Sequence, residues 1–392
     1  MDSPGSILRD FGTLIDFARN NKLLLTAKHQ LPLSALADIN ARLAHPIQLG
    51  LKRPQQKSYP HIHGLFLVAR ASGLTTVDGT GKQPVLVIDD DMVQQWENLN
   101  PTECYGTLLE AWLLRGKPEI VGERGRPFGM LPDNFERSAS FYVRLPGDGL
   151  PVAGNRDAEE GLRYYPEWYN LGLLDLFGLI RIEHGSLEPG KGWQIEWIHR
   201  TPLGDALLAL LYTEFFSDFD NLFRLEDEGK MPFGVLQPVL QPYFPAWQNN
   251  LSVPELEFRK GTFIFKVALG RIWRRIAIDA GQTLDALAWA ILGSVKFDSD
   301  HLYQFSYQTR YGSLQEVNHP YMDAPPFTSE MRIGELPLRV GQTMTFLFDF
   351  GDNWEFDVLL EQVDPDRVTK KSAILESHGK APEQYPGWGD WE

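Results

Sequence analysis

Apolar positions near the start of the chain repeat at the spacing of an amphipathic helix. They recur every three or four residues from Ile7 to Asn20, and the same period returns at 33–43 and at 60–73. Two short alternating runs between residues 74 and 88 flank an Asp-Gly-Thr-Gly turn and predict a hairpin. Three helices followed by a hairpin predict a winged-helix-like domain, which we assign to residues 1–130.

A second set of elements repeats this order. It consists of a helix at 169–177, strands at 179–183 and 193–199, and a further helix that Thr201 caps. The loop 185–192 takes the place of a wing, and the Gly- and Pro-rich stretch 147–161 is interpreted as the linker between the two sets. We therefore predict a second winged-helix-like unit over residues 131–213.

A stretch rich in proline and acidic residues, 214–260, predicts an irregular bridge to the last part of the chain. Beyond it, apolar residues alternate with a period of two, in two strands near 263–278 and in a late hairpin around Gly351-Asp352-Asn353. Between them lie a helix that Thr283 caps and a strand at 301–307. This order predicts a β-grasp-like domain over residues 261–392, so the predicted fold class is α+β with a helical N-terminal region.

Composition restricts the possible functions. The chain has 392 residues and a single cysteine, Cys104, which excludes a disulfide framework or a cysteine-based zinc site. It shows no export signal and no long apolar stretch, so we expect a cytoplasmic protein outside the membrane. No phosphate-cradling glycine loop and no Gly-x-Ser-x-Gly elbow occurs, so we predict no cofactor.

The net charge of −15 is distributed unevenly. Residues 26–82 contain seven Lys and Arg against two Asp and Glu, a local net charge of +5. On a winged helix, cations in or beside the helices contact phosphates, which makes duplex DNA a candidate partner. The DNA-binding candidates are Arg42, Lys52, Arg53, Lys57 and Arg70. The alternative is a solvated face on a winged helix that binds another protein.

Carboxylates gather at the late hairpin, where Asp349, Asp352, Glu355 and Asp357 lie within nine residues. Such a cluster suits acid–base work or a hard cation, but Asp352 with its neighbouring asparagine is equally typical of an ordinary turn. If a catalytic site exists, we expect Asp349, Glu355 and His301 to form it. We assign no metal site, since His61 and His63 are two residues apart and point to different faces of a helix.

Four sequence pieces in the last third resemble the plasmid pRi ORF-three-like family of mobile-element passengers. They are Ile272-Trp273-Arg274-Arg275-Ile276, the helix from Thr283, the stretch Asp298 to Phe305, and Asp349-Phe350-Gly351-Asp352-Asn353-Trp354-Glu355. The motif residues are Trp273, Arg274, Asp300, His301, Asp349, Gly351, Asp352, Trp354 and Glu355. Phe356 stands where the family usually has a histidine, and the family's cysteine-rich ending is replaced by 381–387. The resemblance implies a link to mobile elements and no particular chemistry.

Two functions are consistent with these patterns. The first is a non-catalytic interaction or DNA-associated regulatory protein, whose partner is duplex DNA or another protein. The second is an enzyme with a carboxylate and histidine site in the C-terminal domain. A tail with two tryptophans, Trp388 and Trp391, is expected to dock on its own domain.

Overall fold

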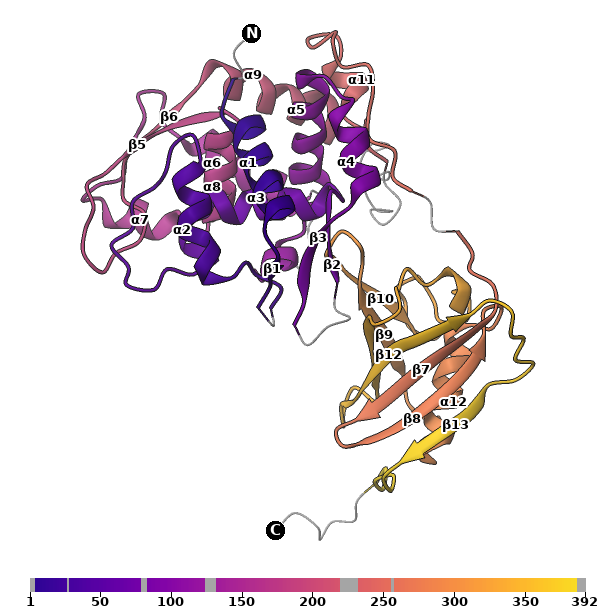
Figure 1. Ribbon diagram of the computed structural model, residues 1–392. Coiled ribbons are helices and arrows are strands. Elements are labelled where there is room, and N and C mark those ends of the chain that lie inside the picture. The colour runs from indigo at the N-terminus through magenta and orange to yellow at the C-terminus, as the bar shows by residue number, and fades with distance from the viewer. Residues whose placement is uncertain are drawn as a thin grey trace. The chain divides into compact units, whose positions relative to one another are not determined.

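Two separate hydrophobic cores organise the chain in the computed structural model. One compact unit runs to Val253 and the other begins at Pro254 (Figure 1), and each is described by itself. The structure describes residues 4–26, 28–78, 83–123, 132–218, 232–254 and 257–385. Helices and sheets occur together, which confirms the predicted α+β class.

The N-terminal unit is mainly helical. Its helices are α1 (Ile7–Asn20), α2 (Leu33–Arg42), α3 (Pro60–Ala71), α4 (Asp90–Glu97), α5 (Pro101–Glu110), α6 (Asp133–Arg144), α7 (Arg156–Gly161), α8 (Trp168–Leu176), α9 (Pro202–Leu211) and α11 (Gln237–Leu240). Shorter helical turns are η1 (Gln56–Ser58), η2 (Ala111–Arg115), η3 (Pro118–Val121) and η4 (Tyr212–Phe216). Its strands are β1 (Leu23–Leu24), β2 (Thr75–Asp78), β3 (Val85–Ile88), β4 (Leu150–Pro151), β5 (Ile180–His184) and β6 (Ile195–Arg200).

The same order of elements occurs twice in this unit. The elements from α1 to β3 follow the order helix, strand, helix, helix, strand, strand, and the elements from α6 to β6 follow the same order. The two small sheets also match, with strand orders β1-β3-β2 and β4-β6-β5. In both repeats the third helix is followed by a left-handed glycine, Gly73 (φ 79°) or Gly178 (φ 72°). The stretch 147–161, predicted as a linker, instead contributes β4 and α7 to the second repeat.

The two third helices, α3 and α8, pack directly against each other. Every residue of α3 is buried. A methyl group added at Gly64 would lie 2.6 Å from Leu173 Cγ, and one added at Gly172 would lie 2.9 Å from the His61 backbone nitrogen. The helices therefore meet where side chains are missing, and one hydrophobic core spans both repeats.

The bridge is fastened to α5, which lies between the two repeats in the sequence. Backbone N–H groups of Gly234 and Leu236 donate to the two carboxylate oxygens of Glu110, each at 2.6 Å. One turn earlier the Trp247 ring covers Gly106, where an added methyl would lie 2.5 Å from the ring. Burial raises the pKa of Glu110 to about 7, while these two amides and Arg115 pull it down. The acidic triplet at 226–228 lies outside the described residues.

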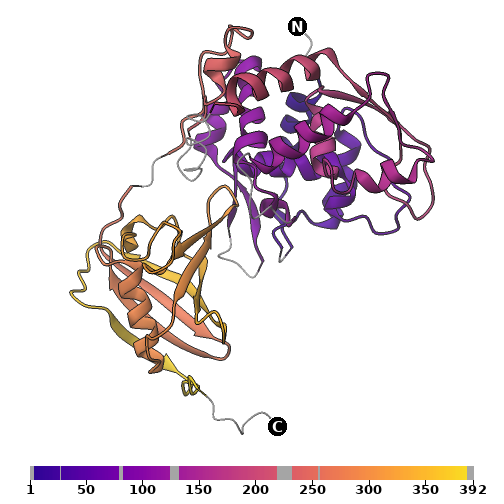
Figure 2. The same ribbon diagram turned by 180° about the vertical axis from the view of Figure 1, so that it is seen from behind.

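The described part of the C-terminal unit is a seven-stranded sheet with one α-helix and one short helical turn, η6 (Ile333–Glu335). Its strands are β7 (Thr262–Leu269), β8 (Ile272–Asp279), β9 (Tyr303–Gln308), β10 (Leu314–Asn318), β11 (Thr343–Phe348), β12 (Trp354–Asp364) and β13 (Ala373–His378), in the order β10-β9-β11-β12-β7-β8-β13. The described strand pairings of this sheet are antiparallel. Helix α12 (Leu284–Val295), which Thr283 caps as predicted, lies on one face, as Figures 1 and 2 show from opposite sides.

Strand alternation determines which residues of this sheet reach the core. Phe265, Ile276 and Phe346 are buried in the core. Their neighbours Lys266 and Arg275 are only half-buried, whereas Ile264 and Ala277 are buried as well, so the alternation is incomplete in β7 and β8. The sequence patterns missed both edge strands, β10 and β13. Strand β13 is exposed along its whole length, and its pairing with β8 shifts by one residue between Ile374 and Glu376, which is a β-bulge.

The α3–α8 crossing predicts unequal effects of alanine at two helical glycines. Gly172→Ala should destabilise the N-terminal unit by about 1–3 kcal/mol, because its new methyl meets the α3 backbone, which has no room to retreat. The matched control is Gly12→Ala in α1, where nothing lies within 4 Å of the added methyl. The control should be neutral or stabilising by up to about 1 kcal/mol. Urea unfolding measures both, and equal midpoints for the two variants would contradict the crossing.

Candidate functional sites

Two of the predicted DNA-binding residues are not free surface cations. Arg70 is 2% exposed within α3, and burial lowers its pKa to about 10. This placement removes Arg70 from the cations that a duplex can touch. Arg42 is at the surface, but its Nε lies 3.0 Å from an Asp38 carboxylate oxygen and its guanidinium covers the Phe17 ring. Its charge is therefore already compensated by a neighbour on α2.

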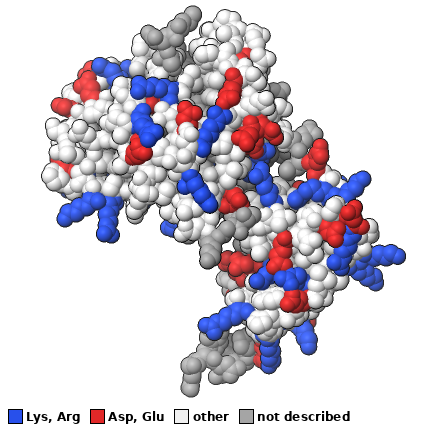
Figure 3. Space-filling view, in the orientation of Figure 1, with Lys and Arg blue, Asp and Glu red and all other residues white. Residues whose placement is uncertain are grey.

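The other three, Lys52, Arg53 and Lys57, are exposed on the segment that joins α2 to α3. Residues 45–59, which we call the basic loop, contain no Asp or Glu. Within the described part of the chain, no carboxylate lies within ion-pair distance of these three cations, although Lys57 is near enough to Glu123 to contribute to the lowered pKa of that carboxyl. Some other exposed cations of the same unit pair with carboxylates, among them Arg19 with Glu97, Arg156 with Glu160 and Arg181 with Glu183. On the face shown in Figure 3, basic and acidic side chains are interspersed rather than separated.

The predicted wing of the second repeat is tied to the basic loop. The Gly50 N–H donates to the Lys191 carbonyl at 2.9 Å, and the Gly190 N–H donates back to the Gly50 carbonyl at 2.9 Å. Lys191 itself pairs with Glu188 at 2.8 Å. The basic loop is therefore fixed in position by the 185–192 loop and presents its cations from a defined backbone.

His61 and His63 lie in the core and diverge, as their spacing predicts. The His61 Nε2 lies 3.0 Å from the Asp175 carboxylate on α8, and the ring packs edge-on against Trp193. His63 accepts at Nδ1 from the Gln56 amide at 3.0 Å, while its Nε2 lies 3.7 Å from Glu123. Each histidine therefore holds α3 to a different neighbour.

A buried charge cluster in the second repeat was not predicted. The Arg137 guanidinium bridges Asp133, at 2.7 Å, and Glu167, at 2.5 Å. Glu167 has a left-handed backbone (φ 76°, ψ 151°), a region that glycine almost monopolises. Burial raises the pKa of Glu167 to about 7, partly offset by Arg137. The spacing of four between Asp133 and Arg137 was readable in the sequence, but the contact with Glu167 depends on tertiary packing.

In the C-terminal unit, two of the three predicted catalytic residues meet. The His301 Nε2 lies 3.5 Å from an Asp349 carboxylate oxygen and 3.8 Å from Asp300. Asp349 is 9% exposed and has a positive φ of 57°. Its other carboxylate oxygen accepts the Gly351 N–H at 2.9 Å, so the side chain also builds the turn. A half-exposed imidazole beside a held carboxylate is suited to accepting a proton.

The third predicted residue, Glu355, is not joined to this pair by any contact among the described residues. It follows Trp354 at the start of β12, where Phe356 is buried in the core, so alternation directs Glu355 to the outer face. Trp354 packs against Phe297 with ring centroids 4.9 Å apart. Asp352 is exposed at the tip of the hairpin.

The C-terminal segment approaches the same histidine. The Tyr385 hydroxyl donates to both Asp300 oxygens, at 3.0 and 2.8 Å, and these bonds lower the pKa of Asp300. The Gln384 side-chain oxygen accepts the Asp298 N–H. The tail with its two tryptophans, 387–392, lies outside the described residues.

The neighbouring motif arginines lie on opposite faces of β8. Arg274 is buried and donates to the backbone carbonyls of Ser294 and His378. Arg275 faces outward and pairs with Glu361 and Glu376. Trp273, on the same outer face, stacks on His378 with ring centroids 5.7 Å apart. The family motif thus links β8 to the edge strand β13.

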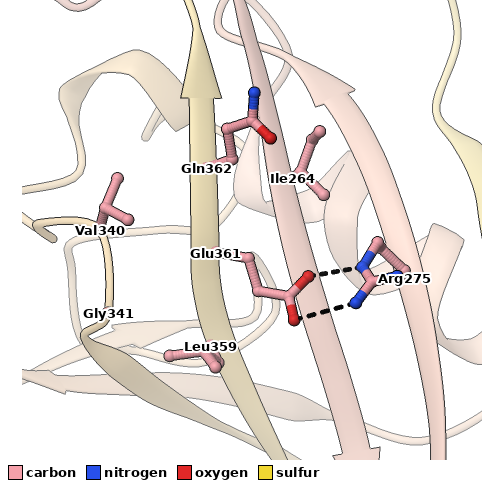
Figure 4. A pocket seen from close by; sticks show the side chains of 7 residues that line it. All are labelled: Ile264, Arg275, Val340, Gly341, Leu359, Glu361 and Gln362. Carbon is pink, nitrogen blue, oxygen red and sulfur yellow. Dashed lines mark hydrogen bonds and ion pairs between the residues drawn. The ribbon is translucent and has the colours of Figure 1, made fainter. Parts of the chain in front are cut away.

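A hollow of about 670 Å³ lies on this outer face (Figure 4). Its lining residues are Ile264, Arg275, Val340, Gly341, Leu359, Glu361 and Gln362. Two hydrogen bonds join Arg275 to Glu361 within it, at 2.5 and 3.2 Å. The polar groups of the hollow therefore satisfy each other, which leaves no unpaired charge there to attract an ion.

Among the described residues, no group of three or more His, Cys, Asp or Glu side chains is arranged to hold a metal ion. Over the same residues, no helix has the length and apolar character needed to cross a membrane.

The buried His63 predicts a pH-dependent stability. Burial lowers its pKa, and the nearby Glu123 only partly opposes this. The folded state therefore binds protons less readily than the unfolded state, whose imidazole titrates near pH 6.5. The stabilisation of the folded state that comes from the lowered pKa of His63 is fully present above about pH 6.5 and is lost as the pH falls through that value. The unfolding free energy should fall between about pH 7.5 and 5.5. His63→Gln should reduce that slope, and identical slopes in urea titrations would refute this assignment.

Comparisons with known proteins bear on the C-terminal unit. Among solved structures, the chain is similar to a crystal structure of a protein of unknown function from Methanosarcina mazei Go1, with 21% identity over 32% of this chain and 72% of that one. The TM-score of that pair is 0.29, too low to support an argument about fold. No curated protein matches the sequence. Residues 264–389 match the model of the plasmid pRiA4b ORF-3-like protein family, which is the family that the motif from Trp273 to Glu355 resembles.

Proposed function

We propose that this chain is a non-catalytic, DNA-associated interaction protein that contacts the duplex backbone without reading base sequence. The observation that carries the proposal is the basic loop, whose three exposed cations, Lys52, Arg53 and Lys57, lie within a carboxylate-free stretch. Cations of this kind are the usual source of non-specific phosphate affinity. A link to mobile elements, suggested by the plasmid in the family's description, belongs to the same proposal.

The two repeats are winged-helix-like units in this proposal. Support comes from their shared order of elements, their matching sheet orders and the left-handed glycine after each third helix. In a DNA-reading winged helix, the recognition helix enters the major groove. Here α3 is buried along its whole length against α8 and other elements, so it has no free face for a groove. This is why we propose backbone contact alone.

The acidic remainder of the chain limits the proposed DNA contact to the area around the basic loop. Outside residues 26–82 the sequence is strongly acidic, and like charge repels phosphate. A cytoplasmic location, proposed from the lone Cys104, is compatible with such a role. The β-grasp-like description of the C-terminal unit stays a prediction, since its described strand pairings are all antiparallel.

The test is binding to labelled duplexes of two unrelated sequences across a salt series. Both duplexes should bind equally, and the logarithm of affinity should fall against the logarithm of salt with a slope of about −3, one unit per contacted phosphate. An Arg53→Glu, Lys57→Glu variant should lose binding. The matched control is Arg156→Glu, Arg181→Glu, which makes the same charge change at cations that already have acidic partners.

Three outcomes would count against the proposal. Absence of binding at low salt would exclude a duplex partner and favour a protein partner. Strong preference for one sequence would require a base-reading element that the packing of α3 does not provide. Equal losses in the two double variants would mean that overall charge, and not the basic loop, determines binding.

A second candidate function is favoured by the geometry at His301. An imidazole 3.5 Å from a nearly buried carboxylate with a strained backbone is the arrangement of a general base and its orienting group. If the C-terminal unit is an enzyme, a hydrolytic activity found by screening ester and phosphoester substrates should vanish in both His301→Ala and Asp349→Asn. Glu355→Gln should keep that activity, because Glu355 faces away from the pair. Activity that survives His301→Ala would eliminate this candidate.

A further inference from the structure

We propose that the C-terminal unit binds a cationic segment of a partner protein on an aromatic surface formed by Trp289, His319 and Tyr321 around Asp285 and Tyr303. An Arg or Lys side chain of the partner lies against the exposed rings, and the neighbouring carboxylates attract it. This surface lies on a different unit from the basic loop. The inference is therefore independent of the DNA proposal, and either one can fail alone.

The first observation is the exposure of two large aromatic side chains. Trp289 on α12 is 56% exposed, and Tyr321 in the loop after β10 is 86% exposed. Trp and Tyr are the residues most often found as energetic anchors of protein interfaces. More than half of each side chain is exposed, and Tyr321 contributes almost no burial to the fold.

The second observation is that contacts connect these side chains to one another. The Trp289 indole N–H donates to Asp285 at 3.2 Å, and the Tyr303 hydroxyl donates to the other oxygen of the same carboxylate. The Tyr303 ring meets His319 edge-on at 4.5 Å, and His319 meets the Tyr321 ring at 5.0 Å. The chain of contacts therefore runs from one exposed ring to the other through Asp285.

The third observation is that the loop which carries Tyr321 is fixed. The His319 Nδ1 accepts the Tyr321 backbone N–H at 3.1 Å. Asn318 donates to the Ala324 and Pro326 carbonyls, and the Thr328 N–H donates to the Asn318 carbonyl. The Asp285 N–H in turn donates to the Thr328 carbonyl at 3.0 Å, which anchors this loop to α12.

Rigid exposed rings reduce the cost of binding. Immobilising a mobile side chain at an interface opposes binding, and a ring that is already held in the free protein loses less conformational freedom. The hydrogen bond to Asp285 restricts Trp289, and the bonded loop restricts the backbone of Tyr321. This surface is therefore preorganised for a partner.

Charge identifies the class of partner. Between Gly281 and Glu335 the sequence has three Lys and Arg against seven Asp and Glu, a net charge of −4. His319 adds no compensating charge at neutral pH, because burial lowers its pKa. Aromatic faces attract guanidinium and ammonium groups through the negative charge of the ring face. A cationic segment satisfies both the rings and the carboxylates.

The test uses a short fluorescein-labelled arginine peptide as the probe and the full-length chain as the receptor. Fluorescence anisotropy should show saturable binding to the native protein, and a glutamate peptide of equal length should not bind. Trp289→Ala and Tyr321→Ala should each weaken the arginine peptide by about tenfold or more, the size expected for an interface anchor. Neither change alters the net charge, so general attraction to an acidic protein stays constant.

Two further variants make the result decisive. Tyr243→Ala removes a tyrosine that is 64% exposed in the other unit, and it should bind the peptide as the native protein does. Trp289→Phe keeps an aromatic ring and should retain more affinity than Trp289→Ala. Failure of the native protein to bind the peptide would overturn the inference, as would equal affinities of Trp289→Ala, Tyr321→Ala and Tyr243→Ala.

Discussion

The close crossing of α3 and α8 is the constraint on which the N-terminal unit depends. Gly64 and Gly172 let two helical backbones approach within a distance that no β-carbon permits. The polar contacts at the crossing, such as His61 with Asp175, follow from that approach. The same crossing helps to bury α3 along its whole length. The packing that joins the two repeats therefore also limits the function that we propose, since a fully buried helix offers no face to a partner.

Much of this architecture was readable in the sequence because local patterns decide it. The helical period from Ile7 to Asn20, the Thr201 and Thr283 caps and the alternation of β7 and β12 are short-range signals, and the structure reproduces them. Local patterns do not show which faces of different helices and strands pack against one another. The edge strands β10 and β13 were missed because they have little buried apolar alternation.

In the candidate sites, too, some features follow from local sequence patterns and others depend on tertiary contacts. The approach of His301 to Asp349 was expected only under the alternative of a catalytic site, and the third expected member, Glu355, does not join them. Asp349 also builds the turn next to which the two residues meet. Arg70 belonged to a basic cluster in the sequence, but it lies on a helix buried on all sides. Hydrophobic periodicity predicts a helix with one buried face and one exposed face. It therefore cannot predict the burial of a polar residue on a helix that is buried on every side, as Arg70 is on α3. The contact of Glu167 with Arg137 joins residues thirty positions apart and had no sequence signal.

The bulge in β13 has a consequence for solubility. An open edge strand with exposed Ile374 and Leu375 is the kind of backbone that pairs with identical chains and starts aggregates. The extra residue between Ile374 and Glu376 breaks the regular spacing of the strand, so a second copy cannot extend the sheet in register along its length. One inserted residue thus opposes edge-to-edge pairing of two copies along this strand.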